Sequence, residues 1–347
     1  MSTTTPRLPV ETLAKFAADA FMTSGVSAGD AAKAAHFMLE SDLAGQDGHG
    51  IFRLAQNINY LRAGRISAKG MIKLASEAPA AALVDGGNAL GHLVMARATE
   101  VAVEKARTQG SAWVGVRSSN HAGAASVWAA QMLPHDMIGL YMAVGPNFMA
   151  PWGGFEKLLG TNPIAIAVPA LEEPPVVLDM ATSIAANGRI QTARQRGEMI
   201  PAGWVMDSRG QPITDPARAD EGSIVPVGEY KGYALSLMIG LIAGTLNEAA
   251  FGRTNTTELS PTNAGQAVCA ISIKQFGDPT AFKRRVDVAV REIRGSGRLP
   301  DVAAIRLPGE RSHAVRVDRM ANGVPVPPGL RAALDKLAGE IGLAKLG

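Results

Sequence analysis

Short apolar segments in the middle of the chain place the strongest constraint on its fold. Each is bounded by glycine, proline or asparagine, which is typical of strands, and they cover residues 112–117, 137–144, 163–169 and 175–180. Segments with helical periodicity lie before and between the first two of them, at 96–110 and 122–133. This arrangement predicts an α/β fold for the middle of the chain.

Helical patterns dominate both ends of the chain. Ser27 and Asp30 are typical of a capped helix start, and a further helix is expected from about Gly50 to Ala63. The C-terminal part predicts one strand and two helices, at 267–274, 279–295 and 327–343. Because 347 residues exceed the usual size of one hydrophobic core, we expect two domains.

Two further segments carry specific expectations. The most apolar helical segment, 233–246, is too short to span a bilayer and is predicted to be a buried core helix. The polar segment 252–266 is predicted to be a loop that could act as a lid.

Composition excludes several classes of protein. The formal charge is only +3 and no long Lys/Arg run is present, so we expect no nucleic-acid partner. No signal peptide or membrane span is predicted. Cys269 is the sole cysteine, which fits a reducing compartment, and we expect a cytoplasmic location.

The stretch "GQDGHGIFRL" at 45–54 is the first candidate for chemistry. On a helix, His49 and Arg53 would project together, away from the apolar side that faces the core. A guanidinium can hold a carboxylate while an imidazole exchanges a proton beside it. The alternative is an exposed polar helix face without function.

Three other stretches are candidates. "RSSNHAGAA" places His121 between a strand and a helix, with Ser118, Ser119 and Asn120 as natural caps. Asp179 ends an apolar strand, where a carboxylate can bind ribose, and Lys231 opens a helix, where an anion can bind. The alternatives are an incidental histidine, a turn carboxylate and a solvated lysine.

Several common motifs are absent. The chain has no Gly-x-Gly-x-x-Gly after a strand, no phosphate loop ending in Gly-Lys-Ser/Thr and no Gly-x-Ser-x-Gly elbow. Six histidines are present, but none forms His-Glu-x-x-His or a tight cluster with cysteine, so we expect no metal site.

Taken together, eight segments in order resemble the type II malate/L-lactate dehydrogenase family, which includes sulfolactate, ureidoglycolate, diketogulonate and piperideine-2-carboxylate enzymes. They are "DLAGQDGHGIFRL", "RSSNHAGAA", "APWGG", "LGTNPIAIAVP", "LDMATS", "IPAGWVMDSRGQPITDP", "KGYALSLMIGLIAGTL" and "LPGER". The resemblance covers nearly the whole chain.

The resemblance implies a fold and an assembly. It implies a nicotinamide-binding domain unlike the Rossmann fold, with a largely antiparallel or mixed sheet, and a helical domain built from both chain ends. The expected division is a helical part at 1–75, a nucleotide-binding and sheet part at about 76–265, and a return to both at 266–347. A homodimer is also implied.

The resemblance also implies roles for residues. His49, Arg53, His121 and Asn120 match the catalytic region, and in different members one or the other histidine is the proton donor. The positions that match cofactor contacts or their support are Asn162, Asp179, Met180, Ala181, Thr182, Ser183, Lys231, Gly309 and Glu310. The cofactor would be NAD or NADP, and Arg189, Arg194 and Arg196 are candidates for a 2′-phosphate site.

The chain departs from the family pattern at two places. Gly48 stands where the family usually has serine, and Asn57 where it usually has tyrosine, so the pocket is expected to be roomier or differently hydrogen-bonded. We predict an NAD(P)-dependent oxidoreductase that acts at C2 of a small 2-oxo or 2-hydroxy acid or a cyclic 2-imino acid. The alternatives are a non-catalytic nucleotide-binding protein and a metal-dependent hydrolase.

Overall fold

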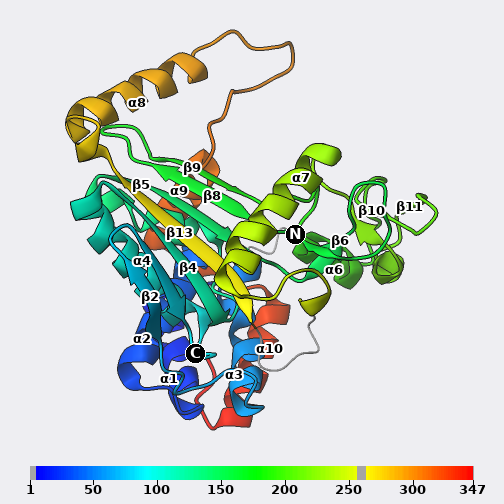
Figure 1. Ribbon diagram of the computed structural model, residues 1–347. Helices are drawn as coiled ribbons and strands as arrows, with labels where there is room; N and C mark the ends of the chain where they lie inside the picture. The colour runs from blue at the N-terminus through cyan, green and yellow to red at the C-terminus, as the bar shows by residue number, and fades with distance from the viewer. Residues whose placement is uncertain (1–4, 256–262, 347) are drawn as a thin grey trace.

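A seven-stranded sheet forms the centre of the computed structural model, which describes residues 5–255 and 263–346 (Figure 1). In spatial order its strands are β2 (Lys73–Ala78), β3 (Ala81–Asp85), β4 (Ser111–Ser119), β13 (Ala264–Ser272), β5 (Met137–Ala143), β8 (Ile164–Val168) and β9 (Val176–Met180). Within this sheet β3 and β4 pair in parallel, and every other described pair is antiparallel. The predicted mixed sheet is confirmed, as are the five predicted strands, which correspond to β4, β5, β8, β9 and β13.

Helices cover both faces of this sheet. On one face, α4 (Gly91–Gln109) and α5 (Ala125–Ala130) pack against strand residues such as Val268. On the other face, α7 (Tyr230–Ile239) and a π-helical turn (Gly240–Gly244) pack against Ala267. Because neighbouring residues of a strand point to opposite faces, Val268 and Ala267 identify the two sides.

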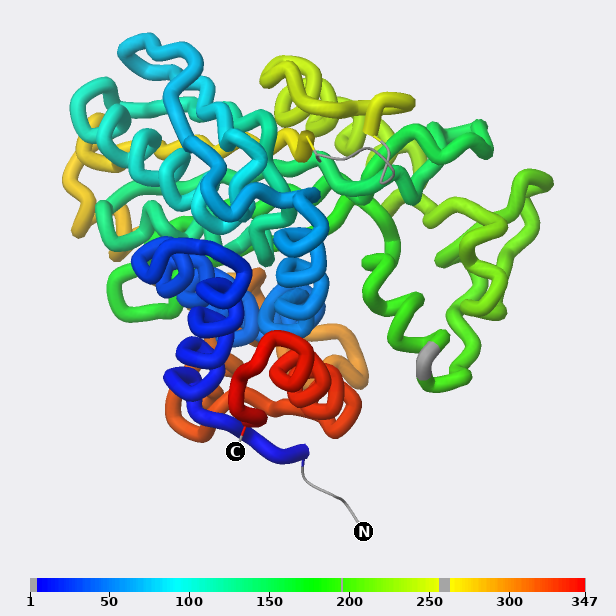
Figure 2. The backbone as a smooth tube through the Cα atoms, turned by 90° about the horizontal axis from the view of Figure 1, so that it is seen from below, coloured from blue at the N-terminus to red at the C-terminus, as the bar shows by residue number. Residues whose placement is uncertain are grey.

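Both ends of the chain build one helical unit. Its core joins α1 (Val10–Thr23), α2 (Ala28–Leu43) and α3 (Leu54–Arg62) to α10 (Pro328–Ile341). Figure 2 shows the blue N-terminal and red C-terminal helices side by side. Strand β1 (Arg7–Leu8) pairs with β14 (Val324–Pro325) and completes the contact. This confirms a helical domain built from both chain ends.

A smaller lobe had no counterpart in the sequence prediction. Its sheet contains β11 (Pro212–Ile213), β10 (Val205–Met206), β12 (Ser223–Ile224), β6 (Asn147–Met149) and β7 (Leu159–Gly160). Helix α6 (Asn187–Arg196) packs beside it through Ile190. Helix α9 (Glu310–Asn322) was also missed, in the segment that was read as a loop before the last helix.

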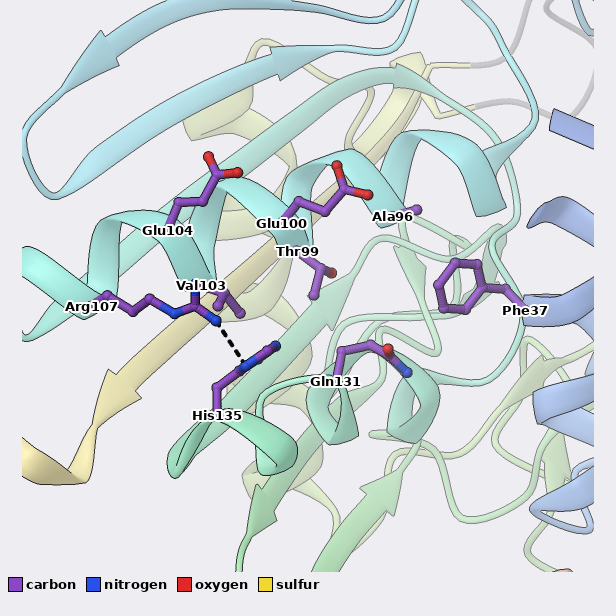
Figure 3. A pocket seen from close by; sticks show the side chains of 9 residues that line it. All are labelled: Phe37, Ala96, Thr99, Glu100, Val103, Glu104, Arg107, Gln131 and His135. Atoms are coloured by element: carbon purple, nitrogen blue, oxygen red, sulfur yellow. Dashed lines mark hydrogen bonds between the residues drawn. The ribbon is translucent and has the colours of Figure 1, made fainter. Parts of the chain in front are cut away.

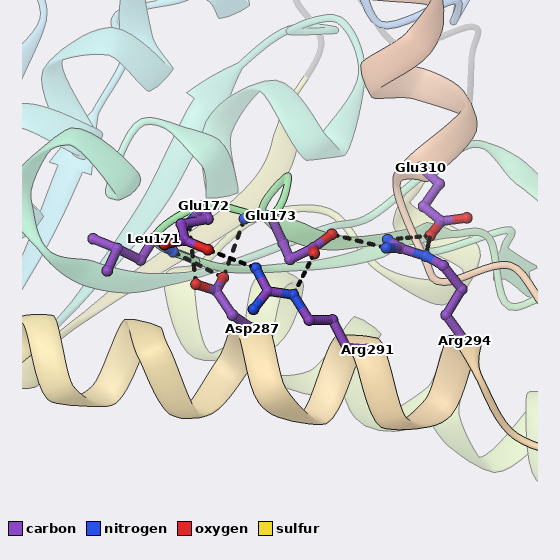
Figure 4. Close-up of polar contacts among 7 residues, drawn as sticks. All are labelled: Leu171, Glu172, Glu173, Asp287, Arg291, Arg294 and Glu310. Carbon is purple, nitrogen blue, oxygen red and sulfur yellow. Dashed lines mark hydrogen bonds and ion pairs between the residues drawn. The ribbon is translucent and has the colours of Figure 1, made fainter.

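Helix α8 (Pro279–Arg294) projects from the body of the molecule (Figure 1). Its buried Asp287 accepts hydrogen bonds from the backbone N–H groups of residues 171–173, in the turn between β8 and β9. Arg291 and Arg294 form ion pairs with Glu172, Glu173 and Glu310 (Figure 4). The attachment of this helix is therefore largely polar.

The prediction of a buried helix at 233–246 was wrong for one of its faces. Met238 is 51% exposed and Leu246 is 66% exposed. Glycines face inward instead: a Cβ on Gly240 would lie 2.0 Å from the Phe251 ring, and one on Gly232 would lie 2.3 Å from the Val227 carbonyl oxygen. Because the small residues make the close contacts, the large apolar ones are left outside. Among the described helices, none is long and apolar enough to cross a membrane.

The predicted caps of the helix after His121 were also wrong. Helix α5 begins only at Ala125, and Ala124 at its N-cap makes no side-chain cap. Distant residues take this part: Ser41 Oγ accepts from the Ala124 N–H at 3.0 Å, and Asp179 Oδ2 accepts from the Ser126 N–H at 2.9 Å. The predicted loop at 252–266 lies partly outside the described residues.

Candidate active site

The fold brings His49 and His121 into direct contact. His49 lies in a 3-10 turn (Asp47–His49) after α2, and His121 lies in the loop between β4 and α5. His49 Nδ1 and His121 Nε2 are 3.0 Å apart, and the two ring planes are within 8° of parallel. Two histidines that the sequence offered as alternatives therefore form one hydrogen-bonded pair.

Both imidazoles favour the neutral state. Protein atoms crowd His121 on several sides, although part of the residue remains open to solvent. This desolvation, together with His49 and Arg53, holds the pKa of His121 well below its ordinary value. Burial and Arg53 also lower the pKa of His49, while Asp179 opposes them. At neutral pH the pair is therefore uncharged and shares one proton along its hydrogen bond.

The hydrogen bonds around the pair indicate its tautomer. The Gly123 N–H donates to His121 Nδ1 at 3.4 Å, so this nitrogen accepts and His121 carries its proton on Nε2. His121 Nε2–H then donates to His49 Nδ1. The neutral His49 ring therefore carries its proton on Nε2, the nitrogen that points away from His121.

Arg53 lies beside the pair as a cation without a carboxylate partner in the described part of the chain. Its Nε donates to the Gly48 carbonyl at 2.9 Å, and its Nη1 donates to Gln56 Oε1 at 2.9 Å. Gln56 in turn donates to the Tyr60 hydroxyl at 3.0 Å. These bonds orient the guanidinium and leave Nη2 available to an anion.

The helix that was expected to carry both His49 and Arg53 is not continuous. Gly50 separates the turn of His49 from a second 3-10 turn (Ile51–Arg53), which leads into α3. The apolar side was predicted correctly, because Ile51, Leu54 and Ile58 are buried. The Arg53 bond to Gly48, rather than an unbroken helical turn, brings the two site residues to the same side.

The loop of His121 is held from behind. Asn120 is buried and its Nδ2 donates to Ala89 O at 2.8 Å and Asn88 Oδ1 at 3.0 Å. Trp128 Nε1 donates to the Ala122 carbonyl at 2.8 Å. Through these bonds Asn120 fixes the backbone that precedes His121.

His92 lies behind this loop, and the sequence gave no reason to select it. It is fully buried, and neither ring nitrogen has a partner among the described residues. Burial lowers its pKa to about 4, so the ring is neutral at neutral pH. A Cβ on Gly123 would lie 3.4 Å from His92 Nε2, so His92 packs against the loop two residues beyond His121. His92 also contributes to the lowered pKa of His121.

Asp179 lies on the strand predicted to bind the cofactor and also acts on the histidine pair. It lies in β9, caps the N-terminus of α5 and acts electrostatically on His49. A carboxylate committed to a helix N-terminus is less free to bind ribose. Its charge instead offsets that of Arg53 at His49.

The end of β9 and the start of α7 lie side by side. Thr182 accepts from the Val227 N–H at 2.9 Å, and Ser183 forms a β-bridge with Pro226. This pairing brings Ser183 near Lys231, which is exposed and has no ion-pair partner among the described residues. Met180 and Ala181, partly buried, connect Asp179 to this edge.

The remaining predicted cofactor residues have different surroundings. Gly309, at the N-terminus of α9, packs on β9, where a Cβ would lie 3.0 Å from the Val177 nitrogen. Glu310 pairs with Arg294. Asn162 is fully buried: Oδ1 accepts from the Gly145 N–H and Nδ2 donates to the Ser236 carbonyl, so it supports two loops from inside.

The two departures from the family pattern differ in their surroundings. Gly48 has open space where a side chain would lie. Asn57 is 4% exposed, and its amide nitrogen has no partner among the described residues. Of the arginines considered for a 2′-phosphate, Arg194 is bound to Asp220 and the Pro216 carbonyl, whereas Arg189 and Arg196 are exposed.

A separate groove of about 300 Å³ lies between α2, α4 and α5 (Figure 3). Arg107 contacts His135 across it at 3.0 Å, and Thr99 faces its interior. None of the predicted site residues lines this groove. Within residues 5–255 and 263–346, no group of three or more His, Cys, Asp and Glu could hold a metal ion.

Comparisons with known proteins identify the relatives of the chain. The malate/L-lactate dehydrogenase family profile matches residues 8–335. An L-sulfolactate dehydrogenase of Methanothermobacter thermautotrophicus is 40% identical over 286 residues, which cover 81% of this chain and 84% of that protein. A (2R)-3-sulfolactate dehydrogenase (NADP(+)) of Chromohalobacter salexigens is 33% identical over 89% of this chain and 90% of that protein.

A solved structure agrees with these relatives. The sulfolactate dehydrogenase from Methanocaldococcus jannaschii superimposes with a TM-score of 0.89 at 36% identity, over 97% of this chain and 98% of that chain. Sequence and structure comparisons therefore agree over almost the full length of the chain.

Proposed function

The chain belongs to the malate/L-lactate dehydrogenase family and is an oxidoreductase, and we propose that it transfers a hydride between a nicotinamide and C2 of a small carboxylate substrate. The substrate classes are 2-oxo and 2-hydroxy acids and, second, cyclic 2-imino acids. The relatives named for malate and sulfolactate support a substrate that carries a second anionic group.

The observation that carries the proposal is a cation without a counter-ion beside a neutral histidine pair. Arg53 lowers the pKa of both His49 and His121, and no described carboxylate forms an ion pair with it. A substrate carboxylate would supply the missing charge and accept two N–H groups from the guanidinium. It would also place C2 next to the imidazoles.

The proton then moves at His49 Nε2. During reduction a doubly protonated His49 gives its Nε2 proton to the carbonyl oxygen or imine nitrogen of the substrate and becomes neutral. During oxidation a neutral His49 with its own proton on Nδ1 accepts the substrate proton at Nε2. In the resting pair the Nε2–H of His121 donates to His49 Nδ1 and orients the ring. For oxidation the pair takes the other tautomer, in which His49 Nδ1–H donates to His121 Nε2. Asp179 favours the cation that His49 becomes when it accepts a proton.

The residues along β9 and α7 fit a nicotinamide dinucleotide. Lys231 and the N-terminus of α7 offer positive charge for the phosphates, and Thr182 has a buried hydroxyl without a partner among the described residues. Met180, Ala181, Ser183, Gly309 and Glu310 would line the same edge. When bound, the cofactor supplies or accepts the hydride, and the protein positions the substrate.

We propose that the cofactor is NADP rather than NAD, and the activity screen described below also tests this choice. Arg189 and Arg196, both exposed on α6 close to Ser183 in sequence, are available for a 2′-phosphate. The relative named for NADP(+) supports trying that cofactor first. A clear preference for NADH would show that these two arginines do not bind a 2′-phosphate.

We further propose a cytoplasmic homodimer. The segment around α8 exposes large apolar side chains, including Phe276 at 82% and Leu299 at 78%, which a second copy would cover. A single free cysteine, Cys269, agrees with a reducing compartment. Light scattering after size-exclusion chromatography should give twice the mass of the 36.1 kDa chain.

The test is a reductase screen of 2-oxo acids and cyclic imines with each nicotinamide. We expect turnover with at least one acid, and binding of the reduced cofactor measured by fluorescence. Tight cofactor binding without turnover on the whole panel would instead indicate a non-catalytic nucleotide-binding protein. Absence of both would refute the proposal.

Substitutions distinguish the roles of the two histidines. General acid–base catalysis contributes about 10²–10⁴-fold, so His49→Ala should lower kcat by that factor. His121→Gln, which keeps a side-chain N–H, should retain more activity than His121→Ala. If His121→Ala were the more damaging of the two alanine variants, the donor would be His121.

A further inference from the structure

Asp42 lies directly beneath the turn that carries His49. It belongs to the last turn of α2, is 2% exposed, and its Oδ2 accepts from the Ile51 N–H at 2.7 Å. Ile51 is the first residue of the 3-10 turn that ends at Arg53. One carboxyl group therefore fixes the chain at the point between the proton donor and the guanidinium.

Gly50 shows how closely this carboxyl group approaches. A Cβ at position 50 would lie 2.1 Å from Asp42 Oδ2, 2.2 Å from Cγ and 2.3 Å from Oδ1. The backbone of Gly50 is not in the left-handed region, with a φ of −94°. The glycine is required here because the carboxyl group rests on its Cα.

Arg319 holds the same turn from the opposite end of the sequence. It is 9% exposed on α9, and its Nη1 donates to the Asp42 carbonyl oxygen at 2.5 Å. Its Nη1 and Nη2 also bind the carboxylate of Asp47, the first residue of the His49 turn. The guanidinium thus links α9, the end of α2 and the turn itself.

We propose that Asp42 and Arg319 are positioning residues that hold residues 47–51 rigid, so that His49 and Arg53 keep their places around the substrate. The part of this proposal that concerns catalysis by His49 rests on the proposed function. Neither residue touches the substrate, and both act through the backbone of the turn. Displacement of a catalytic group by about 1 Å can cost about 10²-fold in rate, which sets the scale of the expected effect.

The ionisation of Asp42 gives a second, independent readout. Burial raises its pKa to about 8, the Ile51 N–H opposes this, Asp47 adds to it and Arg319 opposes it. The carboxyl group is therefore mostly protonated at neutral pH. Because the folded pKa lies above the unfolded value, stability is lost as the pH rises toward and through about 8.

Matched variants test the proposal. Arg319→Ala removes the link to the turn, whereas Arg316→Ala removes another α9–α2 contact, the pair with Glu40 at 2.6 Å, which does not reach the turn. We expect Arg319→Ala to lower kcat by about 10- to 100-fold with cofactor affinity unchanged, and Arg316→Ala to change it by less than about 2-fold. Equal losses in the two variants would overturn the proposal.

Two variants of Asp42 separate the effect of its side-chain shape from the effect of its ionisation. Asp42→Ala should lower kcat as Arg319→Ala does, and Asp42→Asn, which keeps the shape and an acceptor for Ile51, should restore most of it. Urea unfolding from pH 6 to 9 should show wild-type stability falling as the pH rises toward about 8 and levelling off above it, with this fall absent in Asp42→Asn. Identical pH profiles for the two proteins would contradict the assigned ionisation.

One readout does not depend on turnover. Hydrogen–deuterium exchange of residues 47–53 should speed up in Arg319→Ala but not in Arg316→Ala. If no substrate is turned over yet this difference is seen, the proposed function fails while the positioning of the turn stands. If exchange is the same in both variants, the positioning role is refuted whatever the activity.

Discussion

Replacement of Gly50 by alanine should disable the site from within the fold. The added methyl group would lie 2.1 Å from Asp42 Oδ2, so the carboxyl group must move by more than 1 Å to restore ordinary contact. That movement breaks its 2.7 Å bond to the Ile51 N–H. Forced packing costs about 1–3 kcal/mol and an unpaired buried polar group about 1–3 kcal/mol, so we expect a loss of about 2–6 kcal/mol.

Gly48→Ala is the matched control, because no atom lies within 4 Å of the position of its Cβ. Urea unfolding should show Gly50→Ala destabilised and Gly48→Ala close to wild type, within about 0.5 kcal/mol. In the substrate screen, kcat of Gly50→Ala should fall by about 10²-fold, since His49 and Arg53 both border the displaced backbone. Wild-type stability and activity in Gly50→Ala would refute the close packing of Asp42 on the turn.

Three further predictions concern the histidine pair, the packing of the two main cores and metal independence. Because the pKa values of His49 and His121 are lowered, kcat/KM for hydroxy-acid oxidation should fall only as the pH drops below 6.5; a midpoint above that value in the pH–rate profile would contradict the neutral pair. Trp128→Phe leaves the Ala122 carbonyl unpaired and should cost about 1–3 kcal/mol in urea unfolding, whereas Leu54→Ala, in the helical core, should cost about 2–5 kcal/mol. Dialysis against a metal chelator should leave the rate unchanged, and restoration of a lost rate by a divalent ion would reveal a metal requirement.

The strands of the main sheet were predictable from sequence because each is an apolar segment with clear boundaries. The strands of the small lobe were not, since β10, β11 and β12 each have only two residues and show no period. Helix α9 was missed for a different reason. Its one buried residue is Arg319, so the helix lacks the apolar stripe that marks most helices.

The members of the candidate site were predictable, but not their arrangement. His49 and His121 are 72 residues apart in sequence, and their direct bond depends on how the helical unit docks on the sheet. Asn120 and Asn162 were chosen from motifs, yet both are buried and act as internal supports. Asp42 was within a quoted motif, but only the contacts to Ile51 and Arg319 show what it does.

The hydrogen bond between the two histidines crosses the main boundary within the fold. His49 belongs to the helical unit made by both chain ends, whereas His121 belongs to a loop of the seven-stranded sheet. Neither part alone could set the tautomer of His49, because the N–H that fixes it comes from the other part. The C-terminal segment adds a third constraint through Arg319, 277 residues from Asp42. The proton donor is therefore poised only when the start, middle and end of the chain are assembled together, which explains why one turn of five residues receives contacts from such distant parts of the sequence.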